Sequence, residues 1–132
     1  MGHILIFSSS TKETTMTVQE IANRLVELCK IGDYATCYSE LYSPDCVSIE
    51  GEGAPVREVK GMDAILQKGK EWNEMIAEFH SAYVGDPIVA GSHFSLTMGV
   101  DCTLKDGSRM DMHEVCVYQV KDGKIVLEQF FF

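Results

Sequence analysis

The first third of the chain carries apolar residues at helical spacing. Between residues 17 and 31, apolar side chains recur every three or four positions, which places them on one stripe of an amphipathic helix. Thr17, followed three residues later by Glu20, has the pattern of a capping box at the start of this helix. A second stripe covers residues 33–41, and the Ser-Pro-Asp sequence at 43–45 breaks it. The sequence therefore predicts two consecutive helices.

A third helix is predicted after a short strand and a glycine-rich loop. Residues 46–50 (CVSIE) predict the strand, and the glycines and proline within residues 51–55 predict the loop. The helix is expected to run from about residue 61 to residue 78. Its apolar face would carry Met62, Ile65, Leu66, Trp72, Ile76 and Phe79.

Beyond the third helix the apolar period changes to two, as in a β-strand. Short strands are predicted over residues 80–84 and 88–90. The clearest strand covers residues 93–104, where apolar and polar residues alternate strictly, as in a half-buried antiparallel strand. The KDGS sequence at 105–108 and the KDGK sequence at 121–124 predict hairpin turns. The final three strands are therefore expected to be neighbours, and the order of elements predicts an α+β fold.

The chain closes on three consecutive phenylalanines. Alternation places Phe130 and Phe132 on one face of the last strand and Phe131 on the other. Because phenylalanine is costly to expose, we expect this end to be tied into the sheet with both faces covered.

Composition and charge narrow the class of protein. The 132 residues predict one domain, residues 16–132, and the polar, aperiodic residues 1–15 are interpreted as an N-terminal extension, disordered or derived from cloning. The net charge of −9, without a clustered basic stripe, argues against nucleic acid as a partner. Five cysteines without a CxxC pair favour reduced thiols and a cytoplasmic location. No apolar stretch is long enough for a membrane helix, so no membrane partner is expected.

Three segments in this order resemble the nuclear transport factor 2-like superfamily, close to its SnoaL-like polyketide cyclase and ketosteroid isomerase branches. They are KIGDYATCYSELYSPDCVSIEGEG, VKGMDAILQKGKEWNEM and VYQVKDGKIVLEQFFF. The resemblance implies a cone with cystatin-like topology, in which a curved, mostly antiparallel sheet wraps around three N-terminal helices and encloses a pocket. It also implies a homodimer formed through the outer sheet face. The fold alone does not decide the reaction, because members range from isomerases, cyclases and dehydratases to binding modules.

Glu50 is the first candidate for chemistry. The resemblance places it where ketosteroid isomerases hold their catalytic carboxylate, and an apolar pocket would raise its pKa. The alternative is a solvated acid at the rim of a loop. The sequence departs from the isomerase pattern at the two oxyanion donors, since the tyrosine position holds Leu25 and the aspartate position falls at or next to Cys116. Neither side chain donates a strong hydrogen bond, which argues against a steroid isomerase of the known design.

Two further ionisable residues are candidates for assisting roles. Glu114 shares a strand face with Met112, Cys116 and Tyr118, so it would be an acid among apolar groups if that face lines the pocket. The alternative is a cross-strand ion pair. His80 begins a strand just beyond the third helix and is expected near the mouth of the cone, where the alternative is a packing histidine.

Aromatic residues are expected to form the pocket wall. The alternative is a place in the core, which is the usual one for a tryptophan on a helical apolar stripe, but in a cone of this kind core and pocket wall are often one surface. The predicted ligand-binding residues are Tyr34, Trp72, Phe94, Tyr118 and Phe130. The histidines and cysteines lack the short spacings of a zinc site, and no HExxH motif or glycine-rich phosphate loop occurs, so neither a metal nor a cofactor is expected.

The sequence leaves two functions open. The first is a cofactor-free enzyme of the isomerase, cyclase or dehydratase type, which moves a proton on a small hydrophobic or ring-bearing molecule with Glu50, Glu114 and His80 as catalytic groups. The second is a ligand-binding or dimeric interaction module without turnover, which the missing oxyanion donors favour.

Overall fold

The computed structural model describes residues 15–132, which form three helices and one seven-stranded sheet. The helices are α2 (Val18–Lys30), α3 (Tyr34–Leu41) and α4 (Met62–Met75). The strands are β1 (Tyr42–Ile49), β2 (Glu58–Lys60), β3 (Ile76–Val84), β4 (Ile88–Ala90), β5 (His93–Leu104), β6 (Arg109–Lys121) and β7 (Lys124–Phe131). The proposed N-terminal extension, except for Thr15, lies outside the described residues.

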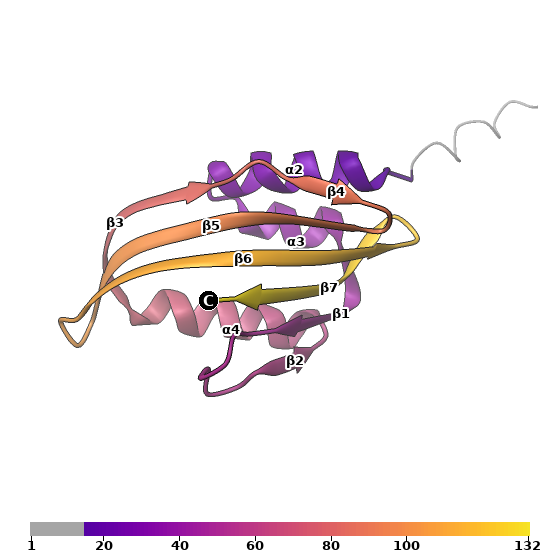
Figure 1. The fold of residues 1–132 in the computed structure, drawn as a ribbon. Coiled ribbons are helices and arrows are strands. Elements are labelled where there is room, and N and C mark those ends of the chain that lie inside the picture. Colours follow the sequence, from indigo (N-terminus) through magenta and orange to yellow (C-terminus); the bar gives the residue numbers. More distant parts are fainter. Residues whose placement is uncertain (1–14) are drawn as a thin grey trace, which may run out of the picture.

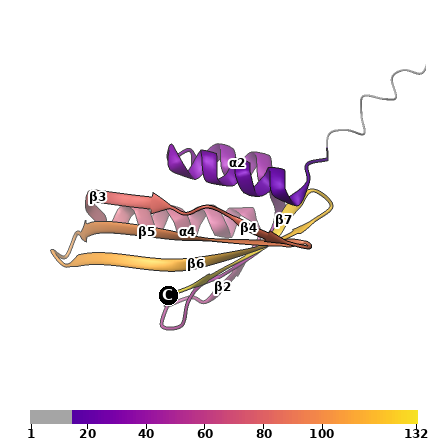
Figure 2. The same ribbon diagram turned by 45° about the horizontal axis from the view of Figure 1, so that its top comes forward.

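The strands form an open sheet in the order β2-β1-β7-β6-β5-β3, with β4 also paired to β5. Only β1 and β7 run parallel; the other pairs are antiparallel. The three helices lie on one side of the curved sheet (Figures 1 and 2). We call the side toward the helices the inner face and the opposite side the outer face. This arrangement confirms the predicted α+β cone, including the meander of the last three strands.

Helix α2 forms where the apolar stripe and the capping box predict it. The Thr17 side chain accepts a hydrogen bond from the Glu20 backbone, and the Glu20 carboxylate accepts one from the Thr17 backbone. These two bonds satisfy backbone N–H groups that have no partner inside the helix. The apolar stripe is buried against the inner face, where Ile21, Ala22 and Leu25 are almost inaccessible.

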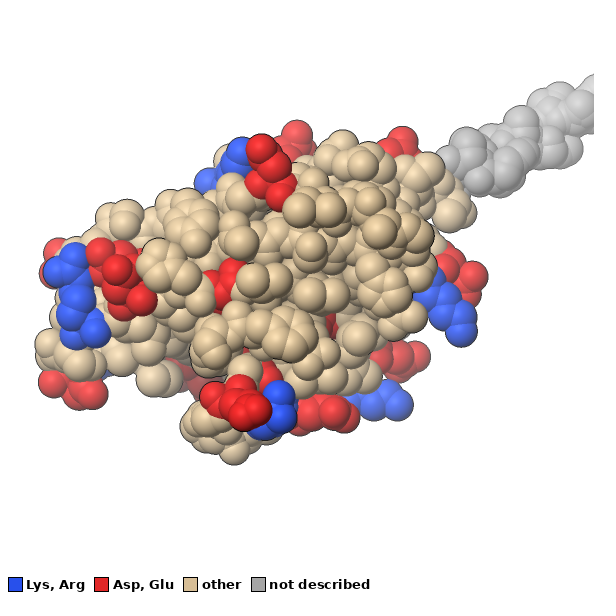
Figure 3. Space-filling view, in the orientation of Figure 1, with Lys and Arg blue, Asp and Glu red and all other residues tan. Residues whose placement is uncertain are grey.

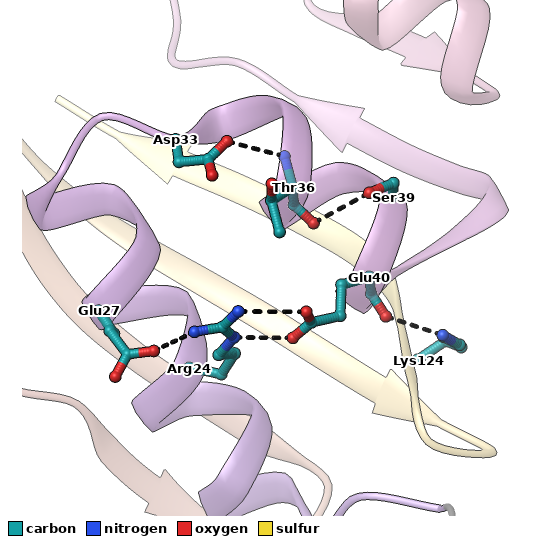
Figure 4. Close-up of polar contacts among 7 residues, drawn as sticks. All are labelled: Arg24, Glu27, Asp33, Thr36, Ser39, Glu40 and Lys124. Carbon is teal, nitrogen blue, oxygen red and sulfur yellow. Dashed lines mark hydrogen bonds and ion pairs between the residues drawn. The ribbon is translucent and has the colours of Figure 1, made fainter.

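Polar contacts join α2 to α3 and α3 to the sheet (Figure 4). Arg24 donates to Glu40 across the two helices and also pairs with Glu27 on its own helix. The Lys124 ammonium donates to the backbone carbonyl of Glu40 at 2.8 Å, which ties the start of β7 to the end of α3. The Asp33 carboxylate caps α3 by accepting from the Thr36 backbone. Partly exposed ion pairs of this kind contribute little each, so they orient α3 more than they stabilise the fold.

The third helix ends earlier than the sequence predicts. Ile76 and Phe79 continue the spacing of the helical stripe, yet both belong to β3. There Ile76 is paired with Leu104 of β5, and Phe79 is paired with Cys102. Pairing with β5 overrides the local helical pattern, because apolar and aromatic residues also suit strands. Strand β1 begins earlier than the sequence predicts and includes Pro44. Strand β2 lies in the segment after the predicted loop.

The chain end is only partly covered. Phe130 points to the inner face with Cys116 opposite it, as alternation predicts. Phe131 and Phe132 remain 49% and 55% exposed, so the single chain does not cover both faces of its last residues. Phe132 lies just beyond β7 with its ring over Gly51, where an added Cβ would lie 2.9 Å from the ring. A side chain at position 51 would therefore displace this ring.

Candidate functional site

A cavity of about 1220 Å³, open to solvent, lies between the helices and the inner face. All three helices and five strands, β1, β3, β5, β6 and β7, contribute to its lining. Apolar and aromatic side chains predominate, with a few polar groups among them. Ligand sites in proteins have this character, typically with volumes of about 300–1,000 Å³. At about 1220 Å³ this cavity is somewhat larger than that range.

Glu114 is an acid in the wall of this cavity. It lies on β6, opposite Met98 of β5, and both residues line the cavity. Burial raises the pKa of the Glu114 carboxyl from 4.5 to about 7, and the negative charge of Glu50 adds to the effect. No ion pair to Glu114 is found within residues 15–132, so the cross-strand pair considered above does not form there. A carboxyl with a pKa near neutrality can both accept and donate a proton.

Glu128 is a second cavity acid, which the sequence reasoning missed. It lies on β7 with only 2% of its surface exposed. Its carboxylate accepts hydrogen bonds from the Tyr42 hydroxyl at 2.5 Å and the Ser48 hydroxyl at 2.6 Å. Burial raises the pKa of Glu128, whereas these two hydrogen bonds and the charge of Lys68 oppose the rise. The signal was present in the sequence, because alternation places Glu128 on the same face as Phe130.

Lys68 connects Glu128, through the Ser48 hydroxyl, to Glu50. Its ammonium donates to the Ser48 hydroxyl at 2.5 Å and pairs with the Glu50 carboxylate. It also lies 5.5 Å from the centre of the Phe130 ring, a cation–π contact at the cavity wall. Glu50 itself is not among the residues that line the cavity. Glu50 therefore acts on the cavity through its charge and through Lys68.

Tyrosine hydroxyls supply hydrogen-bond donors in the cavity. Burial raises the pKa of Tyr38, Tyr42 and Tyr118, so all three are protonated at neutral pH. Tyr42 already donates to Glu128. Within residues 15–132 the Tyr38 hydroxyl makes no hydrogen bond, and its ring lies edge-on to Tyr42 at 4.9 Å. Tyr38 is therefore one donor available to a ligand.

Four of the five predicted ligand-binding residues line the cavity: Tyr34, Trp72, Tyr118 and Phe130. Phe94 does not. It is 1% exposed and stacks on Tyr118 with ring centres 4.7 Å apart, so it belongs to the core behind the wall.

His80 lies away from the cavity. The ring donates to or accepts from the Thr103 hydroxyl at 2.7 Å, on the outer face, next to a register shift between Phe79 and Ser81. Phe79 lines the cavity, whereas His80 does not. The structure thus brings Glu114 and the aromatic wall together and leaves His80 outside.

Among residues 15–132, no group of three or more histidine, cysteine, aspartate or glutamate side chains is arranged to hold a metal ion. None of the helices there is long and apolar enough to cross a membrane.

Comparisons with known proteins identify the family. The SnoaL-like domain model matches residues 16–132. A candidate SnoaL-like polyketide cyclase from Mesorhizobium loti is 38% identical, with a TM-score of 0.83, over 89% of this chain and 100% of that chain. An NTF2-like protein of unknown function from Burkholderia pseudomallei shares the fold at 17% identity, with a TM-score of 0.72 and coverage of 89% of this chain and 92% of that chain.

A structure of TerC co-crystallised with polyporic acid also shares the fold, at 15% identity and a TM-score of 0.68, over 88% of this chain and 92% of that chain. No curated protein matches the chain. The family-model match over nearly the whole described chain confirms the resemblance found in the sequence: the protein belongs to the SnoaL-like family of the NTF2-like superfamily.

Proposed function

We propose that the protein binds a small hydrophobic, ring-bearing molecule in the inner cavity and moves a proton on it without a cofactor. The observation that carries this proposal is Glu114, an acid with a pKa of about 7 in the wall of an apolar cavity of ligand size. At neutral pH such a group is present in both protonation states, as an acid–base catalyst requires. The reaction class is isomerisation, cyclisation or dehydration through an enolate.

The roles follow from where the polar groups lie. Glu114 takes a proton from a carbon next to a carbonyl group and returns it elsewhere. The Tyr38 hydroxyl donates to the carbonyl oxygen, since it has no partner within residues 15–132. This donor replaces the two that the isomerase pattern lacks at Leu25 and Cys116. Glu50 and Lys68 adjust the charge at the cavity wall.

The comparisons support this class of ligand and reaction. The relative from Mesorhizobium loti, at 38% identity, carries the polyketide cyclase designation. TerC, a neighbour in fold only, has been co-crystallised with polyporic acid, which supports the capacity of this fold to enclose an organic ligand.

Binding and proton transfer can be tested with two defined probes. N-phenyl-1-naphthylamine, a neutral apolar fluorophore, should bind in the cavity, and Trp72→Phe should weaken its binding. 5-Nitrobenzisoxazole opens when a base removes its ring proton, so it reports a general base in an apolar site. We expect Glu114→Gln to abolish its turnover, with Glu52→Gln, an exposed loop residue, as the control. Turnover that is equal in wild type and Glu114→Gln would contradict the role of Glu114.

A non-catalytic binding module is the second candidate function. The observation that favours it is that Glu128, the more deeply buried acid, is already occupied by two protein hydroxyls. Tight binding of the naphthylamine, together with no turnover in wild type, would select this candidate.

We also propose a homodimer formed through the outer face. Charged side chains gather mainly around the rim of this face, and its middle is largely uncharged (Figure 3). Val115 and Phe131, which are paired across β6 and β7, are 44% and 49% exposed there. A second copy would cover them and complete the burial expected for the chain end. Sedimentation at micromolar concentration tests this, and Phe131→Glu should give monomers.

A further inference from the structure

The cavity has ammonium groups on its exposed lining. Lys30 lies at the end of α2, Lys70 in the second half of α4 and Lys105 in the turn between β5 and β6, and all three residues line the cavity. The ends of α2 and α4 and the β5–β6 turn lie at the same end of the molecule (Figures 1 and 2). Three elements that are distant in sequence therefore bring a positive charge to the lining of one cavity.

These lysines have no carboxylate partner within residues 15–132. Three other cations do have a carboxylate partner: Arg24 pairs with Glu40, Lys68 with Glu50 and Arg109 with Asp101. The whole chain has a net charge of −9, so acidic residues outnumber basic ones. A group of lysines without carboxylate partners therefore runs against the overall charge. Lys30 also complements the dipole of α2, but this explanation does not extend to Lys105.

Charge is separated along the cavity. The lysines are exposed, whereas Glu128 is buried and Glu114 half-buried on the sheet wall. Glu74, the other acid of the lining, is exposed and lies one helical turn from Lys70. The Glu74 carboxylate weakens the positive field of Lys70, so Lys30 and Lys105 are the better candidates to bind an anion. The two inner acids would repel an anion that entered further.

We propose that the ligand is an organic anion: an apolar ring body with one negatively charged group, such as a carboxylate or sulfonate, at one end. The ring body lies in the aromatic cavity, and the anionic group stays at the opening against Lys30 and Lys105. This orientation brings the uncharged end of the ligand to Glu114. The inference rests on the proposed function for the cavity and adds the chemical class and the orientation of the molecule.

A matched pair of fluorophores tests the anion preference. 8-Anilinonaphthalene-1-sulfonate has the same ring body as N-phenyl-1-naphthylamine and adds one sulfonate. We expect Lys30→Met and Lys105→Met each to weaken sulfonate binding by about two- to fivefold, as for partly exposed ion pairs, and to leave naphthylamine binding unchanged. Raising the salt concentration to about 0.5 M should weaken only the sulfonate. Lys121→Met, an exposed lysine outside the cavity, is the matched control.

Each outcome has a separate meaning. Loss of sulfonate affinity alone, in the two cavity variants but not in the control, supports the proposal. If both probes weaken equally, or if neither probe responds to the substitutions and salt, the anion site is overturned while the apolar cavity stands. If neither probe binds to the wild-type protein, the proposed function fails together with the inference.

Discussion

Ser48 and Glu128 lie directly opposite each other on the parallel strands β1 and β7, and the Ser48 hydroxyl donates to the Glu128 carboxylate at 2.6 Å. This is the one parallel pair of strands in the described sheet. It brings residues that are 80 positions apart in the sequence into a single buried hydrogen bond. Lys68 then extends the contact to Glu50 at the protein surface. Glu128 is therefore held by the pairing that joins the first and the last strand of the described chain.

Removing the buried carboxyl should destabilise the fold. Glu128→Ala leaves the hydroxyls of Tyr42 and Ser48 without their acceptor and opens a void beside them. We expect the free energy of unfolding to fall by about 2–4 kcal/mol. Urea denaturation measures this, and the exposed Glu52→Ala should change stability by less than about 0.5 kcal/mol. Equal stability of the two variants would mean that the Glu128 hydrogen bonds contribute nothing to the fold.

Removing the positive charge of Lys68 should raise the pKa values of both cavity acids. The Lys68 ammonium lowers the pKa of Glu114 and of Glu128, so Lys68→Met removes a favourable interaction with each carboxylate. Titration of the ¹³C-labelled glutamate carboxyls by NMR measures the change. Lys70→Met, two positions along the same helix, has no contact with this network and should leave Glu128 unchanged. Titration curves that are identical in wild type and Lys68→Met would rule out the coupling.

The stability of the protein should fall as pH rises through the range in which Glu114 titrates. The folded protein holds the Glu114 proton up to a pKa of about 7, whereas the unfolded chain releases it near 4.5. The folded state therefore binds more protons between these values, and the contribution of Glu114 is full below the lower pKa and lost above the upper one. It amounts to about 3 kcal/mol at most.

Glu114→Gln should remove that contribution. The difference in unfolding free energy between pH 5 and pH 8 should then be smaller in the variant than in wild type, by up to the same amount. Denaturation of both proteins across this range is the measurement. If the unfolding free energies of wild type and variant change by the same amount between pH 5 and pH 8, Glu114 titrates normally.

The capping box should contribute a modest part of the stability of α2. Thr17→Ala removes the side-chain acceptor for the Glu20 backbone. We expect a loss of about 1 kcal/mol, with Thr17→Ser close to wild type because serine keeps the hydroxyl. Thermal denaturation of the three proteins tests this. A loss that is equal for alanine and serine would assign the effect to the threonine methyl group.

The sequence predicts regular elements well where one pattern acts alone. The bounds of β5 follow from strict alternation over residues 93–104, and the start of α2 follows from Thr17 and Glu20. The end of α4 could not be predicted in this way. Ile76 has helical spacing from Trp72, and only its pairing with β5, which is a long-range contact, makes it the first residue of a strand.

The candidate site is less accessible to sequence reasoning than the fold. Glu114 was predicted from the face that it shares with Tyr118, and Glu128 could have been found by the same rule from Phe130. Phe94 and Tyr118 stack on the same face, yet only Tyr118 reaches the cavity, because depth along the cone decides which side chain is wall and which is core. Alternation gives the face of a residue and not its depth.

The most direct test of the account is the titration of the Glu114 carboxyl by ¹³C NMR, without and with N-phenyl-1-naphthylamine. We expect a pKa of about 7 for Glu114 in the free protein and a further rise when the apolar probe displaces water from the cavity. A pKa near 4.5 that does not respond to the probe would contradict it, because Glu114 would then be an ordinary solvated carboxylate outside any binding site.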